Sequence, residues 1–324
     1  MNDRDGDDDD GGGALHREGT VTDMSSPLMN PNPNDFIIPD LAAKRLELEL
    51  QEDLPDGSMR FPNFTLPIFP GTTFSKVTCN GVPCEWIRTP GSEDSPVVYF
   101  HMHGGGYYRG NTRVEAPGTS VAAGLAKIRC LTVDYRVSPP STDGYRAAAF
   151  PAAVEDCFAA YTWLIDPEGG GVDPKLVVAG GCSAGGGLAV ALLLKIKEQG
   201  VPMPAASVPL SPWVDLTQSG ESYYYNHGKC RYVTKGYLDW ASRQYLDGQD
   251  PRHPLASPLF ADLSGLPPLL IIAGGDETLL DDATLLAARA ATAGCEVSLE
   301  IYPGVSHGFM LGCVPPIAAA AAAQ

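Results

Sequence analysis

The chain has 324 residues, of which 44% are hydrophobic, and a formal net charge of −17 at pH 7. This length accommodates one large α/β domain with residues left for a lid or tails, and the composition excludes a fibrous or wholly disordered protein. The acidic surplus argues against a nucleic-acid partner, because phosphate binding draws on lysine and arginine.

The N-terminal region divides into two segments. Residues 1–25 are rich in Asp, Gly and Ser, and they are predicted to be a disordered acidic tail. Residues 26–60 are predicted to be an N-terminal cap segment, because Leu41–Leu50 has helical character after a proline-rich connector. The start of the chain lacks the basic residues and apolar core of a secretory signal, and no stretch has the roughly 20 apolar residues of a membrane span. We therefore expect a cytoplasmic protein without a membrane span.

Residues 61–212 alternate short apolar runs with amphipathic stretches, and they are predicted to form the first part of a catalytic core. Strands are expected at 97–100, 129–135, 176–179 and 207–210, and helices at 119–127, 150–164 and 187–199. Pro151 suits the first turn of a helix, and Gly200 suits a helix end. Such alternation predicts a mostly parallel sheet with helices on both faces.

The stretch 213–258 interrupts this alternation. It is too long for a plain connection and is rich in tyrosine, so it is predicted to form a helical cap insertion over the site. Residues 259–314 resume the pattern as the second part of the core, with strands at 269–273 and 297–302 and a helix at 279–293. Residues 315–324 are predicted to be an alanine-rich tail.

The strongest local signal is Gly181-Cys182-Ser183-Ala184-Gly185, which matches G-x-S-x-G between an expected strand and an expected helix. A nucleophilic serine needs a sharp turn at the strand end, and flanking glycines leave room for that turn. The next helix directs its positive end at the developing oxyanion. Such a pentapeptide could arise by chance in a chain with 36 glycines, but its context favours Ser183 as the nucleophile.

A second signal, His103-Gly104-Gly105-Gly106, also follows an expected strand. Consecutive glycines let backbone N–H groups approach a substrate oxygen, and with the N–H of Ala184 they would form an oxyanion hole. The alternative is a merely flexible glycine-rich loop. The presence of the serine motif favours the oxyanion hole.

The third signal, Ser306-His307-Gly308-Phe309, follows the last expected strand. A serine on such a sharp strand-to-helix turn lies on what is called a nucleophile elbow. In proteins with this elbow the triad acid and then the triad histidine follow along the chain, and His307 fits that order. The other histidines lie in the tail, the expected cap or the glycine-rich turn: His16, His227, His253, His101 and His103. His307 is therefore the predicted catalytic base.

Four segments carry a family resemblance: HGGG (103–106), DYRVSPP (134–140), GCSAGG (181–186) and SHGF (306–309). Together they resemble the hormone-sensitive lipase family of esterases over residues 61–311. Members of that family are α/β-hydrolases with a mostly parallel central sheet, flanking helices and a helical cap. They cleave short- and medium-chain carboxylic esters without a cofactor. The resemblance implies this fold class, no cofactor, and Gly105, Gly106 and Ala184 as oxyanion donors.

The triad acid is expected just after the strand at 269–273. The family pattern there resembles D-P-L-x-D-[DE], with the first Asp as the acid. Aligning Leu279 with the motif leucine places Glu277 at the acid position, whereas Asp276 requires a one-residue shift. A carboxylate of either length can orient an imidazole. Glu277 is the favoured acid and Asp276 the alternative. Asp281 and Asp282 are expected to cap the next helix through its dipole.

Several other residues have more than one interpretation. Cys182, where the family more often has Asp or Thr, is expected to be a packing residue and not a reactive thiol. Asp134, Arg136 and Asp156 could serve as catalytic charges, but they are expected to form an ion-pair scaffold behind the strand ends, since buried charges must be paired. Tyr107 and Tyr108 are expected either to line the pocket or to pack in the core. The eight cysteines are expected to be reduced, and their spacing predicts no metal site.

We predict a carboxylesterase that acts on small-molecule esters with short to medium acyl groups, using Ser183, His307 and Glu277. Two alternatives stay open. One is a small-molecule receptor, because the gibberellin receptor resembles this family but has lost the triad histidine; the presence of His307 disfavours this reading. The other is amidase, lactonase or deacetylase activity from the same triad. The sequence also leaves a homodimer open.

Overall fold

The computed structural model describes residues 68–138, 147–230 and 233–309, together with strand segments at 52–53, 59–61 and 64–66. The expected tail at 1–25, the helical segment at 41–50 and the tail at 315–324 lie outside the described residues. Within the described ranges, none of the helices has both the length and the apolar character needed to cross a bilayer.

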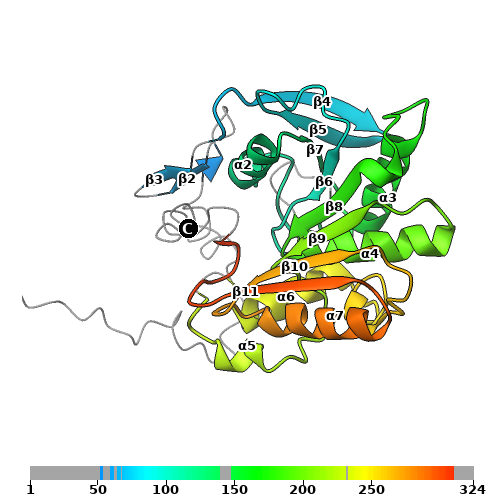
Figure 1. Cartoon of the computed structure of the whole chain (residues 1–324). Coiled ribbons are helices and arrows are strands. Elements are labelled where there is room, and N and C mark those ends of the chain that lie inside the picture. Colours follow the sequence, from blue (N-terminus) through cyan, green and yellow to red (C-terminus); the bar gives the residue numbers. More distant parts are fainter. Residues whose placement is uncertain are drawn as a thin grey trace, which may run out of the picture.

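An eight-stranded sheet forms the centre of the molecule, with its strands in the order β11-β10-β9-β8-β6-β7-β5-β4 (Figure 1). Its strands are β4 (Thr73–Cys79), β5 (Val82–Arg88), β6 (Val98–Met102), β7 (Arg129–Val133), β8 (Val177–Cys182), β9 (Ala206–Leu210), β10 (Leu269–Gly274) and β11 (Val297–Tyr302). The strands from β6 to β11 pair in parallel, and β5 joins them antiparallel to β7. A separate antiparallel sheet contains β1 (Glu52–Asp53), β2 (Met59–Phe61) and β3 (Phe64–Leu66).

The hairpin of β4 and β5 is absent from the sequence prediction. Cys79 pairs with Val82 across the turn formed by Asn80 and Gly81, whose φ angles are 48° and 84°. Asn-Gly is favoured in two-residue hairpin turns because both positions require positive φ. The turn signal is therefore in the sequence. The flanking β4 strand lies at the sheet edge and is largely exposed, so it lacks the apolar run that marks the other strands.

Helices cover both faces of the sheet (Figure 1). They are α2 (Ala116–Ala126), α3 (Ala152–Ile165), α4 (Ala184–Gln199), α5 (Ser222–Tyr225), α6 (Lys235–Leu246) and α7 (Leu280–Thr292). Along β7, Cys130 packs with Ala123 of α2, whereas Leu131 and Val133 pack in the cluster that contains α3 and α4. Successive strand residues point to opposite faces, so α2 lies on the other face from α3 and α4. The predicted mostly parallel sheet with flanking helices is confirmed.

The expected cap insertion, 213–258, contains α5 and α6 among its described residues. Its first part is held by Asp282 in the first turn of α7. The Asp282 carboxylate accepts hydrogen bonds from Val214 N at 2.8 Å, Asp215 N at 2.9 Å and the Tyr223 hydroxyl at 2.7 Å. Burial raises the pKa of Asp282 well above its usual range. Asp282 therefore does more than interact with a helix dipole, because it joins the insertion to the core.

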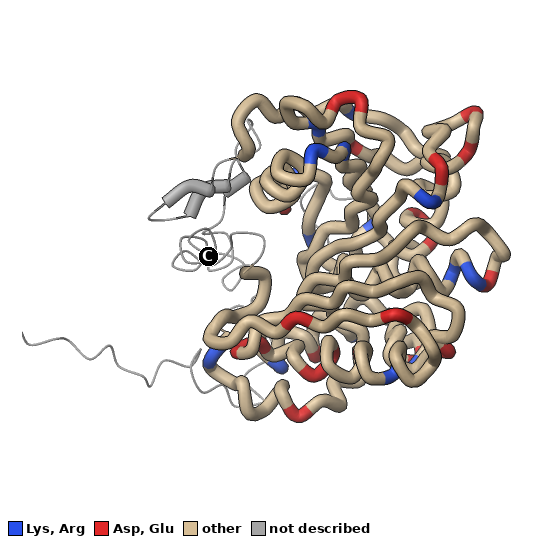
Figure 2. The backbone as a smooth tube through the Cα atoms, in the orientation of Figure 1, with Lys and Arg blue, Asp and Glu red and all other residues tan. Residues whose placement is uncertain are grey.

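Charged residues lie mainly on loops and outward-facing helices, and the central strands are largely uncharged (Figure 2). A partly buried ion pair connects Arg136 with Asp156 of α3. Arg136 Nη2 lies 2.9 Å from Asp156 Oδ1, and Asp156 also accepts a hydrogen bond from Arg136 N at 2.8 Å. Burying a charge is costly unless it is paired, so this contact is the expected structural scaffold.

Candidate active site

The turn between β8 and α4 carries Ser183. The strand ends at Cys182, the helix begins at Ala184, and Ser183 between them has φ 59° and ψ −120°. Such a conformation costs about 1–3 kcal/mol for a residue with a side chain, and it persists only where its surroundings enforce it. Here Ser183 N donates to Leu210 O at 2.9 Å, and Trp213 N donates to Ser183 O at 3.0 Å. The strained turn therefore fixes the serine at the carboxyl end of β8.

Gly185, the last glycine of the serine motif, has a packing role that can be tested. Alanine normally stabilises a helix relative to glycine by about 0.5–1 kcal/mol. A Cβ on Gly185, however, would overlap the carbonyl oxygen of Met102 and lie 2.6 Å from its carbonyl carbon. We expect Gly185→Ala to lower the free energy of unfolding by about 1–3 kcal/mol, as overpacking does. Thermal unfolding followed by circular dichroism measures this change.

Gln199→Ala is the matched control for that variant, because Gln199 is exposed at the end of the same helix. It should leave the melting temperature nearly unchanged. A Gly185→Ala protein as stable as the parent would show that the β6 end and α4 can separate without cost.

The glycine-rich loop that follows β6 passes directly beside the serine. A Cβ built on Gly104 would lie 3.3 Å from Ser183 Cβ. Gly105 and Gly106 have φ of 113° and 62°, which a residue with a side chain rarely adopts. Among the described residues, neither of their amides donates a hydrogen bond. Ala184 N is the first amide of α4 and has no intrahelical acceptor. The loop and the helix start can therefore offer backbone donors near Ser183.

The turns after β10 and β11 bring a carboxylate and an imidazole together. His307 Nδ1 lies 2.8 Å from Glu277 Oε2, and Glu277 Oε1 accepts a hydrogen bond from Gly274 N at 2.9 Å. Glu277 is fully buried, and the side chain of His307 is 10% exposed. An ionised carboxylate only accepts hydrogen bonds, so an ionised Glu277 requires a proton on His307 Nδ1, which in the neutral ring leaves Nε2 as an acceptor. This tautomer suits a base that removes a hydroxyl proton.

Asp276, the alternative acid, points elsewhere. Its Oδ1 lies 3.2 Å from Lys229 Nζ, and its side chain is 37% exposed. The turn itself is held by Asn226, whose Nδ2 donates to Gly275 O at 3.1 Å and to Glu277 O at 2.9 Å. The two acidic side chains therefore differ in burial and in partner.

The described side chains of Ser183 and His307 are not joined by a hydrogen bond. Catalytic hydrogen bonds are commonly long before a substrate is bound, and they shorten in the reacting complex. The arrangement thus comprises an elbow serine beside a glycine-rich loop, and a separate Glu277–His307 contact.

Residues 97–311 match the family described as having an alpha/beta hydrolase fold. An acetyl-hydrolase of Streptomyces hygroscopicus is 40% identical over 231 residues, which cover 71% of this chain and 73% of that protein. The crystal structure of an esterase from the bacterial hormone-sensitive lipase family has a TM-score of 0.72 and 42% identity, covering 79% of this chain and 82% of that chain. The chain belongs to the hormone-sensitive lipase family of α/β-hydrolases.

A further relative of this α/β-hydrolase is an esterase of Acinetobacter venetianus, 30% identical over 246 residues that cover 76% of this chain and 77% of that protein. The relatives are named as esterases and an acetyl-hydrolase, so the chain is a hydrolase of the esterase type. The family resemblance expected from the sequence motifs is confirmed.

The two tyrosines that follow Gly105 and Gly106 have different surroundings. Tyr107 is 2% exposed and stacks on Tyr245 with ring centroids 3.9 Å apart, so it is a core residue. Tyr108 instead contacts Tyr237 and Trp240 of α6, with centroids 6.0 Å and 4.9 Å away. Two side chains of α6 therefore lie against the segment that follows Gly105 and Gly106.

Two other residues of interest are buried inside the hydrolase. Cys182 is 2% exposed, as expected for a packing residue. His103 stacks on Tyr135 with ring centroids 4.1 Å apart, and burial lowers its pKa to about 3. His103 is therefore neutral at neutral pH, and it packs against Tyr135 in the interior. In the part of the chain that the structure describes, no cluster of three or more His, Cys, Asp and Glu side chains could hold a metal ion.

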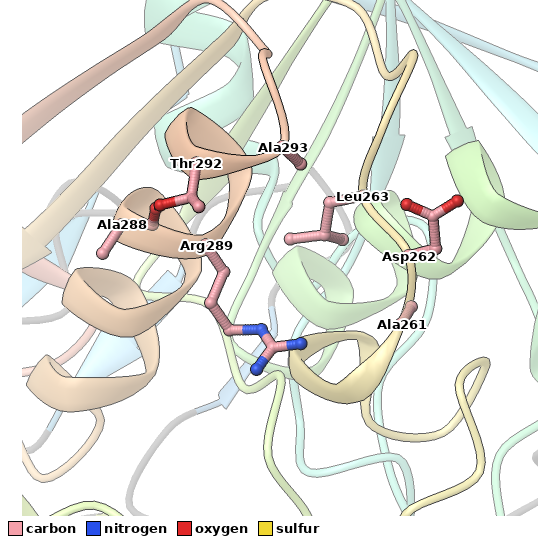
Figure 3. Close-up of a pocket in the computed structure, with 7 residues that line it drawn as sticks. All are labelled: Ala261, Asp262, Leu263, Ala288, Arg289, Thr292 and Ala293. Atoms are coloured by element: carbon pink, nitrogen blue, oxygen red, sulfur yellow. The ribbon is translucent and has the colours of Figure 1, made fainter.

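A surface cleft of about 490 Å³ lies between α7 and the segment that follows the 3-10 helix Pro258–Phe260 (Figure 3). Its lining residues are Ala261, Asp262, Leu263, Ala288, Arg289, Thr292 and Ala293. Asp262 pairs with Lys197 at 2.9 Å. No predicted catalytic or oxyanion residue lines this cleft, so it is separate from the candidate active site.

Proposed function

We propose that the chain is a carboxylesterase that hydrolyses esters with short to medium acyl groups, with Ser183, His307 and Glu277 as its triad. The observation that carries this proposal is the 2.8 Å contact between Glu277 and His307. Both residues follow the carboxyl ends of parallel strands, as Ser183 does. The family supports ester hydrolysis, and the arrangement of the site supports these three residues as the catalytic groups.

In the first step, His307 Nε2 takes the proton of Ser183 Oγ as that oxygen attacks the ester carbonyl carbon. The negative charge that forms on the carbonyl oxygen is stabilised by the N–H groups of Gly105, Gly106 and Ala184. Glu277 stabilises the imidazolium and holds its orientation. When the tetrahedral intermediate collapses, His307 gives the proton to the leaving alcohol and an acyl-enzyme remains.

In the second step, water repeats the route. His307 takes a proton from the water as its oxygen attacks the acyl carbon, and the same backbone donors stabilise the oxyanion. The proton then returns to Ser183 Oγ as the acid product leaves. Neither step requires a metal ion or an organic cofactor.

A preference for short acyl groups is supported by the residues of α6 near the loop of Gly104, Gly105 and Gly106, here called the oxyanion loop. A Cβ on Gly106 would overlap the hydroxyl oxygen of Tyr237, so α6 approaches this glycine closely. Tyr237 and Trp240 also pack against Tyr108. Bulky aromatic side chains in these positions leave little length for an acyl chain. The acetyl-hydrolase name of the Streptomyces relative points the same way.

A p-nitrophenyl ester series from acetyl to palmitoyl tests this function, with the Ser183→Ala protein as the blank. We expect kcat/KM to be highest among the shortest chains and to fall by about 5- to 150-fold for chains that overfill the pocket, because overpacking costs about 1–3 kcal/mol. A maximum at palmitoyl would contradict the chain-length preference. Turnover of amides or lactones alone would favour those activities, and ligand binding without turnover of any of these substrates would favour a receptor.

A further inference from the structure

We propose that Glu115, together with His101, is a positioning residue that holds the oxyanion loop in its working conformation. This inference rests on the proposed ester hydrolysis, because it assigns a role in the oxyanion hole. It concerns two buried residues for which the sequence gives no role beyond their place near the glycine-rich turn.

The contacts of Glu115 connect it to the loop directly. Its Oε1 accepts a hydrogen bond from Gly104 N at 2.8 Å, and its Oε2 lies 2.7 Å from His101 Nε2. His101 Nδ1 in turn lies 3.3 Å from the Tyr99 hydroxyl. Glu115 is 7% exposed and His101 is 1% exposed. A buried carboxylate is therefore shared between the first amide of the glycine run and an imidazole.

Glu115 accepts a hydrogen bond from Gly104 N, and the proposed oxyanion donors Gly105 N and Gly106 N are the next two amides along the chain. Tyr135 hydroxyl donates to His103 O at 2.6 Å, so the peptide between His103 and Gly104 is held at both its carbonyl and its N–H. A Cβ on Gly104 would lie 3.0 Å from Cys182 O and 3.3 Å from Ser183 Cβ. Gly104 thus lies between Glu115 and the nucleophile turn, and rotation of its peptide would also move the next two amides.

The chemistry explains why a strong acceptor stands here. Oxyanion donors must be arranged before the reaction, since a misplacement of about 1 Å can cost about a hundredfold in rate. A hydrogen bond to a carboxylate is shorter and stronger than one to a neutral acceptor. The same carboxylate is costly to bury without a partner, and His101 supplies that partner.

The test compares four proteins with p-nitrophenyl butyrate: wild type, Glu115→Ala, Glu115→Gln and Glu85→Gln. Glu85 is the matched control, because its buried carboxylate binds the Arg113 guanidinium, with Oε1 2.8 Å from Nη2, and has no contact with the glycine run. We expect Glu115→Ala to lower kcat by about 10- to 100-fold with little change in KM. Glu115→Gln keeps an acceptor for Gly104 and should recover most of kcat. Glu85→Gln should lower the melting temperature without lowering kcat.

Hydrogen–deuterium exchange of residues 103–110 gives a readout that does not depend on turnover. This peptide should exchange faster in Glu115→Ala and remain at the wild-type rate in Glu85→Gln. If Glu115→Ala does not fold, Glu115→Asp keeps a charge facing His101 and shortens the reach to Gly104, with the same expected loss of kcat.

Two results would overturn the proposal: a Glu115→Ala protein with wild-type kcat and wild-type exchange, or a Glu115→Gln protein as slow as Glu115→Ala. Absence of ester hydrolysis in the wild type would instead contradict the proposed function, and the exchange measurement would still decide whether Glu115 holds the loop.

Discussion

Replacing Ser183 with alanine is expected to lower kcat for p-nitrophenyl butyrate by about 10⁶-fold, because removal of a triad nucleophile elsewhere costs about that much. No other oxygen in the elbow can form the acyl-enzyme, so only background catalysis from the oxyanion donors would remain. Substrate binding and folding should change little, since Ser183 is held through its backbone by Leu210 and Trp213. Steady-state kinetics and thermal unfolding of the purified variant measure both expectations.

Cys182→Ala is the matched control for the Ser183 variant. It removes the other nucleophilic side chain of the elbow, one position away and 2% exposed. We expect its kcat to stay within a few-fold of wild type, with a modest loss of stability from the small cavity. If Cys182→Ala lost activity as Ser183→Ala should, or if Ser183→Ala kept substantial turnover, the nucleophile assignment would be wrong.

The sequence was sufficient for those parts of the fold that rest on local patterns. The helix that ends at Gly200 shows this, because the structure ends α4 at Gln199 and gives Gly200 a φ of 64°. The sequence predicts the start of this helix at residue 187, three residues late, because three successive glycines lower helix propensity. Packing overrides propensity there, as the tight approach of Gly185 to Met102 shows.

Support around the site could not be read from the sequence in the same way. Asn226 reaches the acid turn across 51 positions, and Glu115 reaches His101 across 14. Neither pair has a spacing that a helix or strand period would reveal, because the contacts exist only after the sheet has assembled. Asp282 shows the same limit, since its place in the first turn of α7 was expected but its bonds to Val214 and Asp215 depend on the fold.

A second large loss of kcat is expected when the proposed triad acid, Glu277, is replaced. Glu277→Ala is expected to lower kcat by about 10⁴-fold, the loss seen when a triad carboxylate no longer orients its histidine. Without Glu277 Oε2, His307 Nδ1 loses its 2.8 Å partner, and the tautomer that frees Nε2 is no longer favoured. Because the Glu277 side chain also accepts from Gly274 N, the variant should lose stability as well. Glu277→Gln keeps the size of the side chain and separates the loss of charge from the cavity.

Asp276→Ala is the paired variant that decides between the two adjacent acids. Its carboxylate meets only the half-exposed Lys229 among the described side chains, and surface pairs of this kind contribute about 0–1 kcal/mol. We therefore expect Asp276→Ala to keep kcat within about twofold, because the turn itself is held by Asn226 through backbone oxygens and not by Asp276. Steady-state kinetics on both variants at one pH, with thermal unfolding as the check on folding, give the comparison. The reverse ranking would assign the triad acid to Asp276, and it would mean that the turn after β10 rearranges when substrate binds.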